Sequence, residues 1–234
     1  MKKAVFNWSG GKDSSLSLYY ILQAKEYDIR YLLTSVNSKF NRISMHGVRQ
    51  ELLRRQAESL GIPLHMIMVP EMPTMAIYDD LMEKTLKGFN QEGIDHSIFG
   101  DIFLEDLRKY REERLAQVGM KGIFPIWKIP SQKLVREFID LGFKAVLVCV
   151  DEKVLDRSFA GRSLDDALLK DLPANVDPCG ENGEYHSFVY DGPIFKRPIA
   201  FDFGEVVHRD YAAATTDAAV HTGFWYCDLI PKGL

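Results

Sequence analysis

The feature that most constrains this chain is a polar, glycine-rich segment at residues 9–14, with the sequence SGGKDS. It follows an apolar run at residues 4–8 and precedes a stretch with leucine and isoleucine at helical spacing. This order predicts a strand, a tight turn and the start of a helix. Two glycines let a backbone approach an anion closely, and a helix N-terminus presents unpaired N–H groups with a partial positive charge. We therefore expect the segment to bind phosphate, with Lys12 adding a positive charge.

The order of residues within this segment distinguishes it from the common phosphate-binding loop. In the pattern G-x-x-x-x-G-K-[ST] the lysine precedes a hydroxyl residue that holds magnesium, whereas Lys12 precedes Asp13. The segment instead resembles the S-G-G-x-D-S pyrophosphate loop of the ATP pyrophosphatase superfamily. That resemblance implies cleavage of ATP between its α and β phosphates and transfer of AMP to an oxygen of the substrate. Glycine- and serine-rich turns also begin helices that bind no ligand, and that alternative stays open for the loop taken alone.

Length and composition are those of an ordinary globular enzyme. A chain of 234 residues, 46% hydrophobic and 26% charged, is long enough for one large or two small domains. Its net charge of −4 argues against a broad nucleic-acid surface. The three cysteines are far apart and form no C-x-x-C pair, so neither a disulfide framework nor a zinc knuckle is expected. The apolar run near the start is too short for a signal peptide or a membrane span, and we expect a cytoplasmic protein.

Strand-like and helix-like patterns alternate through the first half of the chain. Beyond the segment at residues 4–24, the predicted strands are residues 29–36, 64–69 and 97–99, and the predicted helices are residues 47–60, 75–89 and 104–118. Such alternation predicts an α/β fold with a mostly parallel sheet and helices on both faces. Ligands of such sheets bind beyond the carboxyl ends of the strands. We therefore expect residues 9–14 and Gly100-Asp101 to face one cleft.

The pattern changes after residue 123. Residues 124–127 are predicted to be extended, Ser131 to cap a helix, and residues 145–150 to form a buried strand. From Asp177 onward, turn sequences separate alternating stretches typical of β-hairpins. We therefore predict two domains: residues 1–123 bind ATP, and residues 124–234 form a smaller, mixed α+β domain that binds the substrate.

Residues 177–193 are a second concentration of polar groups. Within them, Asn182-Gly183 predicts a tight turn, after which side chains alternate between the two faces of a strand. Glu184 and His186 then share a face, where a carboxylate and an imidazole could orient a substrate amine or transfer protons. A hairpin whose polar residues only face water fits the same pattern.

The polar residues of the two motifs raise the question of a zinc site and of a magnesium site. Possible zinc ligands lie in the second polar stretch, namely Cys179, Glu181, Glu184 and His186. No second histidine or cysteine is spaced to complete a tetrahedron around zinc. Magnesium carried by ATP needs only one or two carboxylates, and Asp13 and Asp101 are the candidates.

The helix predicted at residues 104–118 is strongly charged. Arg108, Arg111 and Arg114 alternate with acidic residues, which is typical of a salt-bridged face in solvent. The alternative is that one of these arginines turns toward phosphate in the cleft.

Together these motifs resemble the diphthine–ammonia ligase family, a branch of the pyrophosphate-loop ATPases with a Rossmann-like, HUP-type α/β fold. The matching segments extend from residue 4 to about residue 205 and are residues 9–14, Gly100-Asp101-Ile102, residues 124–127, Leu155-Asp156 with Gly161-Arg162, and residues 177–193. The resemblance implies an AMP-forming ligase that uses ATP and Mg²⁺. A substrate carboxylate is adenylated with release of pyrophosphate, and ammonia then displaces AMP to give an amide.

The resemblance also implies roles for individual residues. The pyrophosphate of ATP is bound by Ser9, Gly10, Gly11, Lys12, Asp13 and Ser14, and the α-phosphate side is bordered by Gly100 and Asp101. The acceptor is bound by Glu181, Asn182, Gly183, Glu184, Tyr185, His186 and Ser187. The residues expected to be catalytic are Lys12, Asp13, Glu184 and His186. We hypothesise that Glu181, Glu184 or His186 accepts a proton from ammonium.

Three residues depart from the pattern of eukaryotic members. Asn182, His186 and Ser187 differ from the form E-G-G-E-Y-E-T, so the chain resembles bacterial members of the family. The expected partners are ATP, ammonia and an acceptor that carries a carboxylate, whether diphthine or another group on a small molecule or protein. Neither DNA nor a membrane is an expected partner, and a homodimer is one option. Two other functions stay open, an adenylating enzyme that modifies RNA or tRNA and a non-catalytic ATP-binding sensor module.

Overall fold

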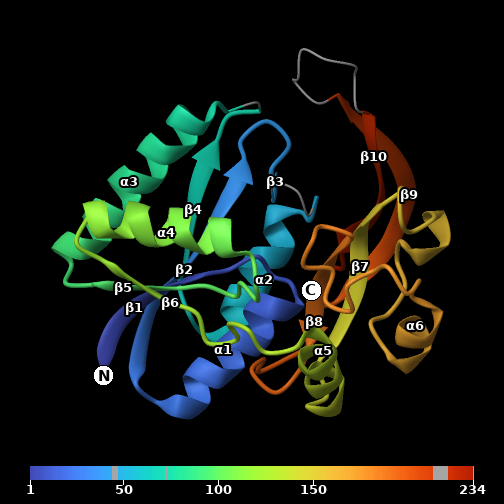
Figure 1. The fold of residues 1–234 in the computed structure, drawn as a ribbon, viewed down its shortest axis with the longest axis horizontal. Coiled ribbons are helices and arrows are strands. Elements are labelled where there is room, and N and C mark those ends of the chain that lie inside the picture. Colours follow the sequence, from blue (N-terminus) through green and yellow to red (C-terminus); the bar gives the residue numbers. More distant parts are fainter. Residues whose placement is uncertain (44–46, 72, 213–220, 234) are drawn as a thin grey trace.

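Two β-sheets, built from successive parts of the chain, lie side by side in the computed structural model (Figure 1). The structure describes residues 1–43, 47–71, 73–212 and 221–233. The first sheet, here sheet A, has the strand order β3-β2-β1-β5-β6, with β4 also paired to β2. The strands of sheet A are β1 (Lys2–Asn7), β2 (Tyr27–Asn37), β3 (Arg42–Ile43), β4 (Leu64–Val69), β5 (His96–Ile98) and β6 (Lys121–Ile123).

The second sheet, here sheet B, has the order β8-β7-β10-β9. Its strands are β7 (Lys144–Asp151), β8 (Tyr185–Asp191), β9 (Phe201–Ala212) and β10 (His221–Pro231). The helices are α1 (Lys12–Ala24), α2 (Gln50–Leu60), α3 (Met75–Gln91), α4 (Glu105–Gln117), α5 (Ser131–Asp140), a 3₁₀ turn η1 (Arg157–Phe159) and α6 (Asp166–Asp171). None of the helices in the described part of the chain combines the length and apolar character that crossing a bilayer requires.

Sheet A is mostly parallel, as the alternating pattern predicts. Strand β1 pairs in parallel with both β2 and β5, β4 pairs in parallel with β2, and β6 pairs in parallel with β5. Among the strands of sheet A in the described residues, only the two-residue β3 is antiparallel to its neighbour. Because β1 and β5 are adjacent and parallel, the loops that follow them leave the same edge of the sheet. The predicted α/β fold is therefore confirmed.

The alternating side chains of β1 explain why helices cover both faces of sheet A. Ala4 and Phe6 pack in one buried cluster with residues of α1 and α2, whereas Val5 points to the other face. There Val5 packs with Leu86 of α3 and Leu115 of α4. A strand with apolar residues on both faces is typical of the centre of a parallel sheet.

One hydrophobic cluster joins the two sheets. The cluster that contains Phe6 and Leu52 also contains Val146 and Val148 of β7, Phe188 of β8, and two residues of β10. The predicted domain boundary near residue 123 stays a prediction, since the sheets lie on either side of it and yet share this core. Continuous apolar packing of this kind favours a fixed relation between the two sheets.

Three local predictions were wrong. Residues 124–127 form a turn and not an extended segment, and the N-cap of α5 is Pro130, not Ser131. The predicted hairpin at residues 177–193 has only one strand, β8, which pairs with the earlier β7. The reason is the Asp177 carboxylate, which accepts hydrogen bonds from the N–H groups of Cys179 and Glu181 and holds these residues in turns. Farther along, β9 and β10 pair antiparallel, as predicted for the C-terminal part.

Candidate active site

The segment at residues 9–14, here the phosphate loop, connects β1 to α1 as predicted. Gly10 has a φ of +77°, a conformation that favours glycine, and Gly11 is the N-cap of α1. The Ser14 hydroxyl donates to the Gly11 carbonyl at 2.9 Å, and its oxygen lies 3.1 Å from that of Ser9. The first turn of α1 therefore presents its unpaired N–H groups at the end of β1, which is the arrangement that binds anions.

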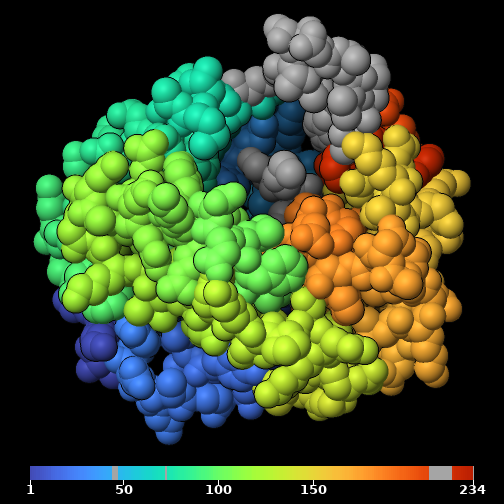
Figure 2. Space-filling view, in the orientation of Figure 1, coloured from blue at the N-terminus to red at the C-terminus, as the bar shows by residue number. Residues whose placement is uncertain are grey.

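The end of β5 packs directly against the phosphate loop. A Cβ atom built on Gly100 would lie 3.0 Å from the Ser14 nitrogen, so no larger residue fits there without a shift. Both segments line one cavity of about 540 Å³, together with Leu33 to Ser35 of β2, side chains of α3 and α4, and several of residues 180–187. Figure 2 shows this face of the molecule hollowed between the teal and green helices α3 and α4 and the orange part around residue 180. A cavity of this size is typical of small-molecule sites.

Lys12 and Asp13 form a close ion pair in this cavity. The Lys12 ammonium lies 2.6 Å from a carboxylate oxygen of Asp13 and 5.3 Å from the centre of the Tyr185 ring. Lys12 is only 4% exposed. Burial disfavours its charged form, but the Asp13 carboxylate outweighs that effect and raises the pKa of Lys12 above its ordinary value. The Lys12 side chain therefore stays protonated at neutral pH, paired with the Asp13 carboxylate.

Asp101, at the carboxyl end of β5, is held by Arg111 of α4. The Arg111 guanidinium contacts both carboxylate oxygens, with Nε 2.8 Å from Oδ2 and a second nitrogen 3.2 Å from Oδ1. Burial raises the pKa of the Asp101 carboxyl group, while Arg111 opposes that shift. The guanidinium also lies over the Phe99 ring, 4.5 Å from its centre. Arg111 thus lines the cavity, and the alternative that an arginine of this helix turns toward phosphate stays a prediction.

Glu181 lines the cavity from the side of sheet B. Its Oε1 accepts a hydrogen bond from the Ile102 N–H at 2.8 Å, so this carboxylate bridges to the loop that follows β5. Burial, together with the negative charges of Asp13 and Asp101, raises the pKa of Glu181 to about 7. Near neutral pH the group exists in both protonation states.

The sequence predicts that Glu184 faces the acceptor, but in the structure its side chain does not line the cavity. Its carboxylate accepts hydrogen bonds from the N–H of Asp177 and from both the backbone and side-chain N–H groups of Asn182, at 2.9–3.0 Å. Neither Glu184 nor Asn182 is among the described residues that line the cavity. The physical reason is that β8 begins only at Tyr185, so Glu184 still belongs to the turn, where nearby N–H groups capture its carboxylate.

The first residues of β8 complete the cavity. Tyr185, His186 and Ser187 line it, and Ser187 Oγ accepts a hydrogen bond from the Lys12 N–H at 3.1 Å. Burial, with a smaller contribution from the Lys12 charge, lowers the pKa of His186 to about 4. The imidazole is therefore neutral at pH 7. Of residues 181–187, here the acceptor-side segment, five line the cavity, and the two whose side chains do not are Asn182 and Glu184.

Sequence reasoning missed Gln56 of α2. Its side chain is fully buried and hydrogen-bonds to Trp8, to the Gly10 carbonyl and to the Val189 carbonyl. One signal was available in the sequence. Gln56 lies on the same helix face as buried leucine and alanine residues, and a buried amide requires hydrogen-bond partners.

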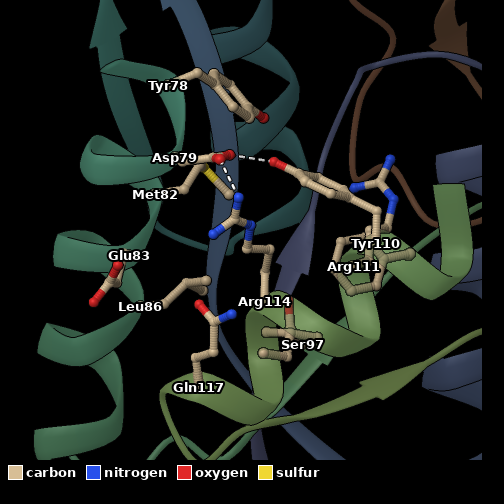
Figure 3. Close-up of a pocket in the computed structure, with 12 residues that line it drawn as sticks. Tyr78, Asp79, Met82, Glu83, Leu86, Ser97, Tyr110, Arg111, Arg114 and Gln117 are labelled. Atoms are coloured by element: carbon tan, nitrogen blue, oxygen red, sulfur yellow. Dashed lines mark hydrogen bonds and ion pairs between the residues drawn. The ribbon is translucent and has the colours of Figure 1, made fainter. Parts of the chain in front are cut away.

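A smaller pocket lies between α3 and α4 (Figure 3). It shares four residues with the lining of the large cavity, namely Tyr78, Met82, Phe99 and Arg111. The Asp79 carboxylate at the centre of the smaller pocket accepts hydrogen bonds from the Tyr110 hydroxyl and the Arg114 guanidinium, as the dashed lines in Figure 3 indicate. Its volume of about 50 Å³ holds one or two water molecules, and its central charges are already paired. We assign it no ligand.

The possible zinc ligands of the second polar stretch do not converge. In the described parts of the chain, only Glu152, His208 and Asp210 bring three metal-ligand atoms within 4.8 Å of one another, on an exposed surface of sheet B. Cys179 is buried, its thiol lies 3.3 Å from the Ser131 carbonyl, and burial raises its pKa to about 12. A protonated, enclosed thiol is neither a good ligand nor a nucleophile.

Comparison with known protein families shows to which family the chain belongs. Residues 1–122 match the diphthamide synthase N-terminal domain, and residues 130–215 match the diphthamide synthase C-terminal domain. The chain belongs to the diphthamide synthase family. The resemblance that the motifs carry is thereby confirmed.

Curated relatives of this family member are named diphthine–ammonia ligase. The chain is 26% identical to the protein of Danio rerio over 230 residues, which cover 88% of this chain and 89% of the relative. It is 27% identical to the protein of Homo sapiens over 221 residues, covering 85% and 82%. A stretch of 111 residues is 34% identical to the protein of Schizosaccharomyces pombe and covers 44% of this chain but 18% of that longer protein.

Among solved structures, the chain has a weak likeness to a U34-tRNA thiolase of Methanococcus maripaludis that was determined with its [4Fe-4S] cluster. The TM-score is 0.37 and the identity 21%, over 60% of this chain and 57% of that one.

Proposed function

We propose that this protein is an AMP-forming, ATP-dependent ligase that adenylates a carboxylate and then amidates it with ammonia. One observation carries the proposal: the phosphate loop and the acceptor-side segment line the same cavity. A ligase of this type needs both the nucleotide and the acceptor within one enclosed site, because positioning provides much of the rate. The name of the curated relatives supports diphthine as the acceptor and ammonia as the nitrogen source.

The nucleotide is held by the phosphate loop. The N–H groups in the first turn of α1 that follow the capped Lys12 N–H donate to the β- and γ-phosphates, and the Lys12 ammonium neutralises their charge as pyrophosphate leaves. Asp13 and Asp101 both line the cavity, and two carboxylates are a donor set that suits Mg²⁺. When bound there, Mg²⁺ supplies further neutralisation of the phosphate oxygens.

The reaction needs two displacements. An oxygen of the acceptor carboxylate attacks the α-phosphorus, the bond from the α-phosphorus to the bridging oxygen breaks, and pyrophosphate leaves. Ammonia then attacks the acyl carbon, the carbon–nitrogen bond forms, and the bond from that carbon to AMP breaks. The proton released from nitrogen passes to a base. The protein supplies the orientation, the positive charge near phosphate and that base.

Among the three candidate bases, the geometry favours Glu181. The carboxylate of Glu184 is engaged by three N–H groups of the turn, and the imidazole of His186 has a pKa of about 4, too low to take a proton from ammonium readily. Glu181 lines the cavity and has a pKa of about 7. Its negative form also attracts the ammonium cation into the site.

The test is an incubation of the protein with ATP, Mg²⁺, ¹⁵N-ammonium and a diphthine-bearing protein, followed by mass spectrometry. Formation of AMP together with a ¹⁵N-labelled amide on the acceptor is the expected result, and Lys12→Met is the matched inactive control. AMP without incorporated ¹⁵N would contradict ammonia as the second substrate. Binding of ATP without AMP from any acceptor would instead support a non-catalytic ATP-binding module.

A further inference from the structure

The side chain of Gln56 connects three segments that are distant in sequence. Its Oε1 accepts a hydrogen bond from the Trp8 indole N–H at 2.9 Å, just after β1. Its Nε2 donates to the Gly10 carbonyl at 3.0 Å and to the Val189 carbonyl at 2.6 Å. The amide is fully buried, and both of its donor hydrogens and its acceptor are used.

This amide lies in direct contact with the backbone of the phosphate loop. A Cβ atom on Gly10 would lie 2.7 Å from Gln56 Oε1. The Gly10 carbonyl accepts a second hydrogen bond, from the Val189 N–H at 2.9 Å. Gln56, Gly10 and Val189 therefore form a closed set of hydrogen bonds, in which the loop is fixed to the middle of β8.

Strand β8 continues directly into the acceptor-side segment. Two residues before Val189, Ser187 caps the Lys12 N–H, and its carbonyl oxygen would lie 3.0 Å from a Cβ atom on Gly11. Farther back, Glu181 bonds to the Ile102 N–H across the cavity. The phosphate loop is therefore joined to β8 both directly, through Ser187 and Val189, and through Gln56.

We propose that Gln56 is a positioning residue that fixes the phosphate loop to β8, so that occupation of the loop by pyrophosphate is transmitted to the residues that face the acceptor. The proposal rests on the proposed function, because it assumes that the loop binds pyrophosphate. Gln56 does not line the cavity. It acts by holding the phosphate loop and β8 in a fixed relative position, which keeps the α-phosphorus close to the acceptor. Small displacements of the reacting atoms from one another strongly reduce the rate.

Ser59, one turn farther along the same helix, provides a matched control. It is also buried, and its hydroxyl exchanges hydrogen bonds with the carbonyl and the N–H of Arg197, at 2.6 and 3.0 Å. Ser59 thus ties α2 to the C-terminal part of the chain without contacting the phosphate loop. A purely structural role for Gln56 predicts that Gln56→Met and Ser59→Ala behave alike.

The experiment is a titration of the ¹⁵N-labelled full chain with inorganic pyrophosphate, followed by NMR. In the wild type we expect signals of the loop amides, of the Ser187 and Val189 amides and of the Trp8 indole to shift along one binding curve. In Gln56→Met the loop signals and the Ser187 signal, whose hydroxyl bonds the loop directly, should still shift, with a dissociation constant within about threefold, while the amplitude at Val189 falls by at least half. Ser59→Ala should keep the wild-type amplitudes.

Three outcomes separate this inference from the proposed function. A wild-type amplitude at Val189 in Gln56→Met, with normal loop shifts, would overturn the role of Gln56 alone. A wild type in which pyrophosphate shifts no loop signal would overturn the proposed function and this inference with it. If Gln56→Met does not fold, the titration of the wild type still tests the inference. A shift of the β8 amide signals without a shift of the Trp8 indole signal would exclude transmission through Gln56.

Discussion

The hydroxyl of Ser187 caps the helix that begins at Lys12. Its oxygen accepts the Lys12 N–H at 3.1 Å, although the two residues are 175 positions apart in the chain. Helix N-caps are usually local, supplied by the residue just before the helix. Here the local N-cap, Gly11, has no side chain, and sheet B supplies the missing acceptor. The stability of the phosphate loop therefore depends on the C-terminal half of the protein.

Replacing this remote cap tests that dependence. Ser187→Ala should lower the free energy of unfolding by about 1 kcal/mol, the usual effect of losing an N-cap hydroxyl. Ser187→Thr keeps the hydroxyl and should retain most of the stability. Urea unfolding of the three proteins measures the differences, and equal losses in the alanine and threonine variants would show that the hydrogen bond contributes nothing.

Glu184 was expected to be catalytic, but its carboxylate stabilises the turn before β8, so we predict that its replacement affects stability and not the chemistry. Glu184→Ala removes three hydrogen bonds to a buried carboxylate and should destabilise the protein by about 2 kcal/mol. In the fraction that remains folded, the ratio of amide to AMP should stay at its wild-type value. A variant of wild-type stability that forms AMP but no amide would return the catalytic role to Glu184.

The sequence predicted long regular elements well, because their apolar periodicity reflects local burial. The strand predicted at residues 64–69 coincides with β4, and the helix predicted at residues 75–89 lies within α3. The short strands β3 and β6 carry too few residues for any periodicity, and they were missed. Strand β5 is as short as β6 and was predicted from the Gly100-Asp101 turn that follows it. The hairpin at residues 177–193 was wrong because the side chain of Asp177 decides the local structure there.

The candidate site was predictable only where a local motif encodes it. The phosphate loop and Gly100-Asp101 follow from the position of each segment at the end of a strand. By contrast, Gln56 and Arg111 contribute through contacts with residues about 46 and 10 positions away, and nothing in their own sequence neighbourhood specifies those partners. The direction of the Glu184 side chain likewise depends on where β8 begins.

The Lys12–Asp13 pair allows the charge of the loop to be separated from its fold. Lys12→Met should abolish measurable AMP formation, since the phosphates lose their buried counter-charge. It should also destabilise the protein, because the Asp13 carboxylate then lacks its partner. The double variant Lys12→Met/Asp13→Asn should be more stable than Lys12→Met and equally inactive. Thermal unfolding with an AMP assay measures both effects, and a double variant no more stable than the single one would contradict the pairing argument.

Glu181 should give the reaction a pH dependence that a glutamine removes. With a pKa of about 7, the carboxylate is mostly protonated at pH 6 and mostly ionised at pH 8, so amide formation measured at a fixed concentration of free ammonia should rise across this range. Glu181→Gln should lose this rise and most of the amide, while pyrophosphate is still released, because adenylation does not use this base. An unchanged pH profile in Glu181→Gln would assign the base elsewhere.

The same carboxyl group makes an independent prediction about stability. Because its pKa is higher in the folded protein than the ordinary value for glutamate, the folded state binds the proton more tightly than the unfolded state. The stabilisation this provides is fully present below the ordinary pKa and is lost as the pH rises through about 7. Glutamine stays neutral and can still accept the Ile102 N–H. The free energy of unfolding of Glu181→Gln, minus that of the wild type, should therefore be larger at pH 8 than at pH 5. Urea unfolding of both proteins at the two pH values measures this difference. A stability difference between the two proteins that stays constant with pH would mean that the carboxyl group titrates alike in the folded and unfolded chains, which would remove the physical basis for choosing Glu181 as the base.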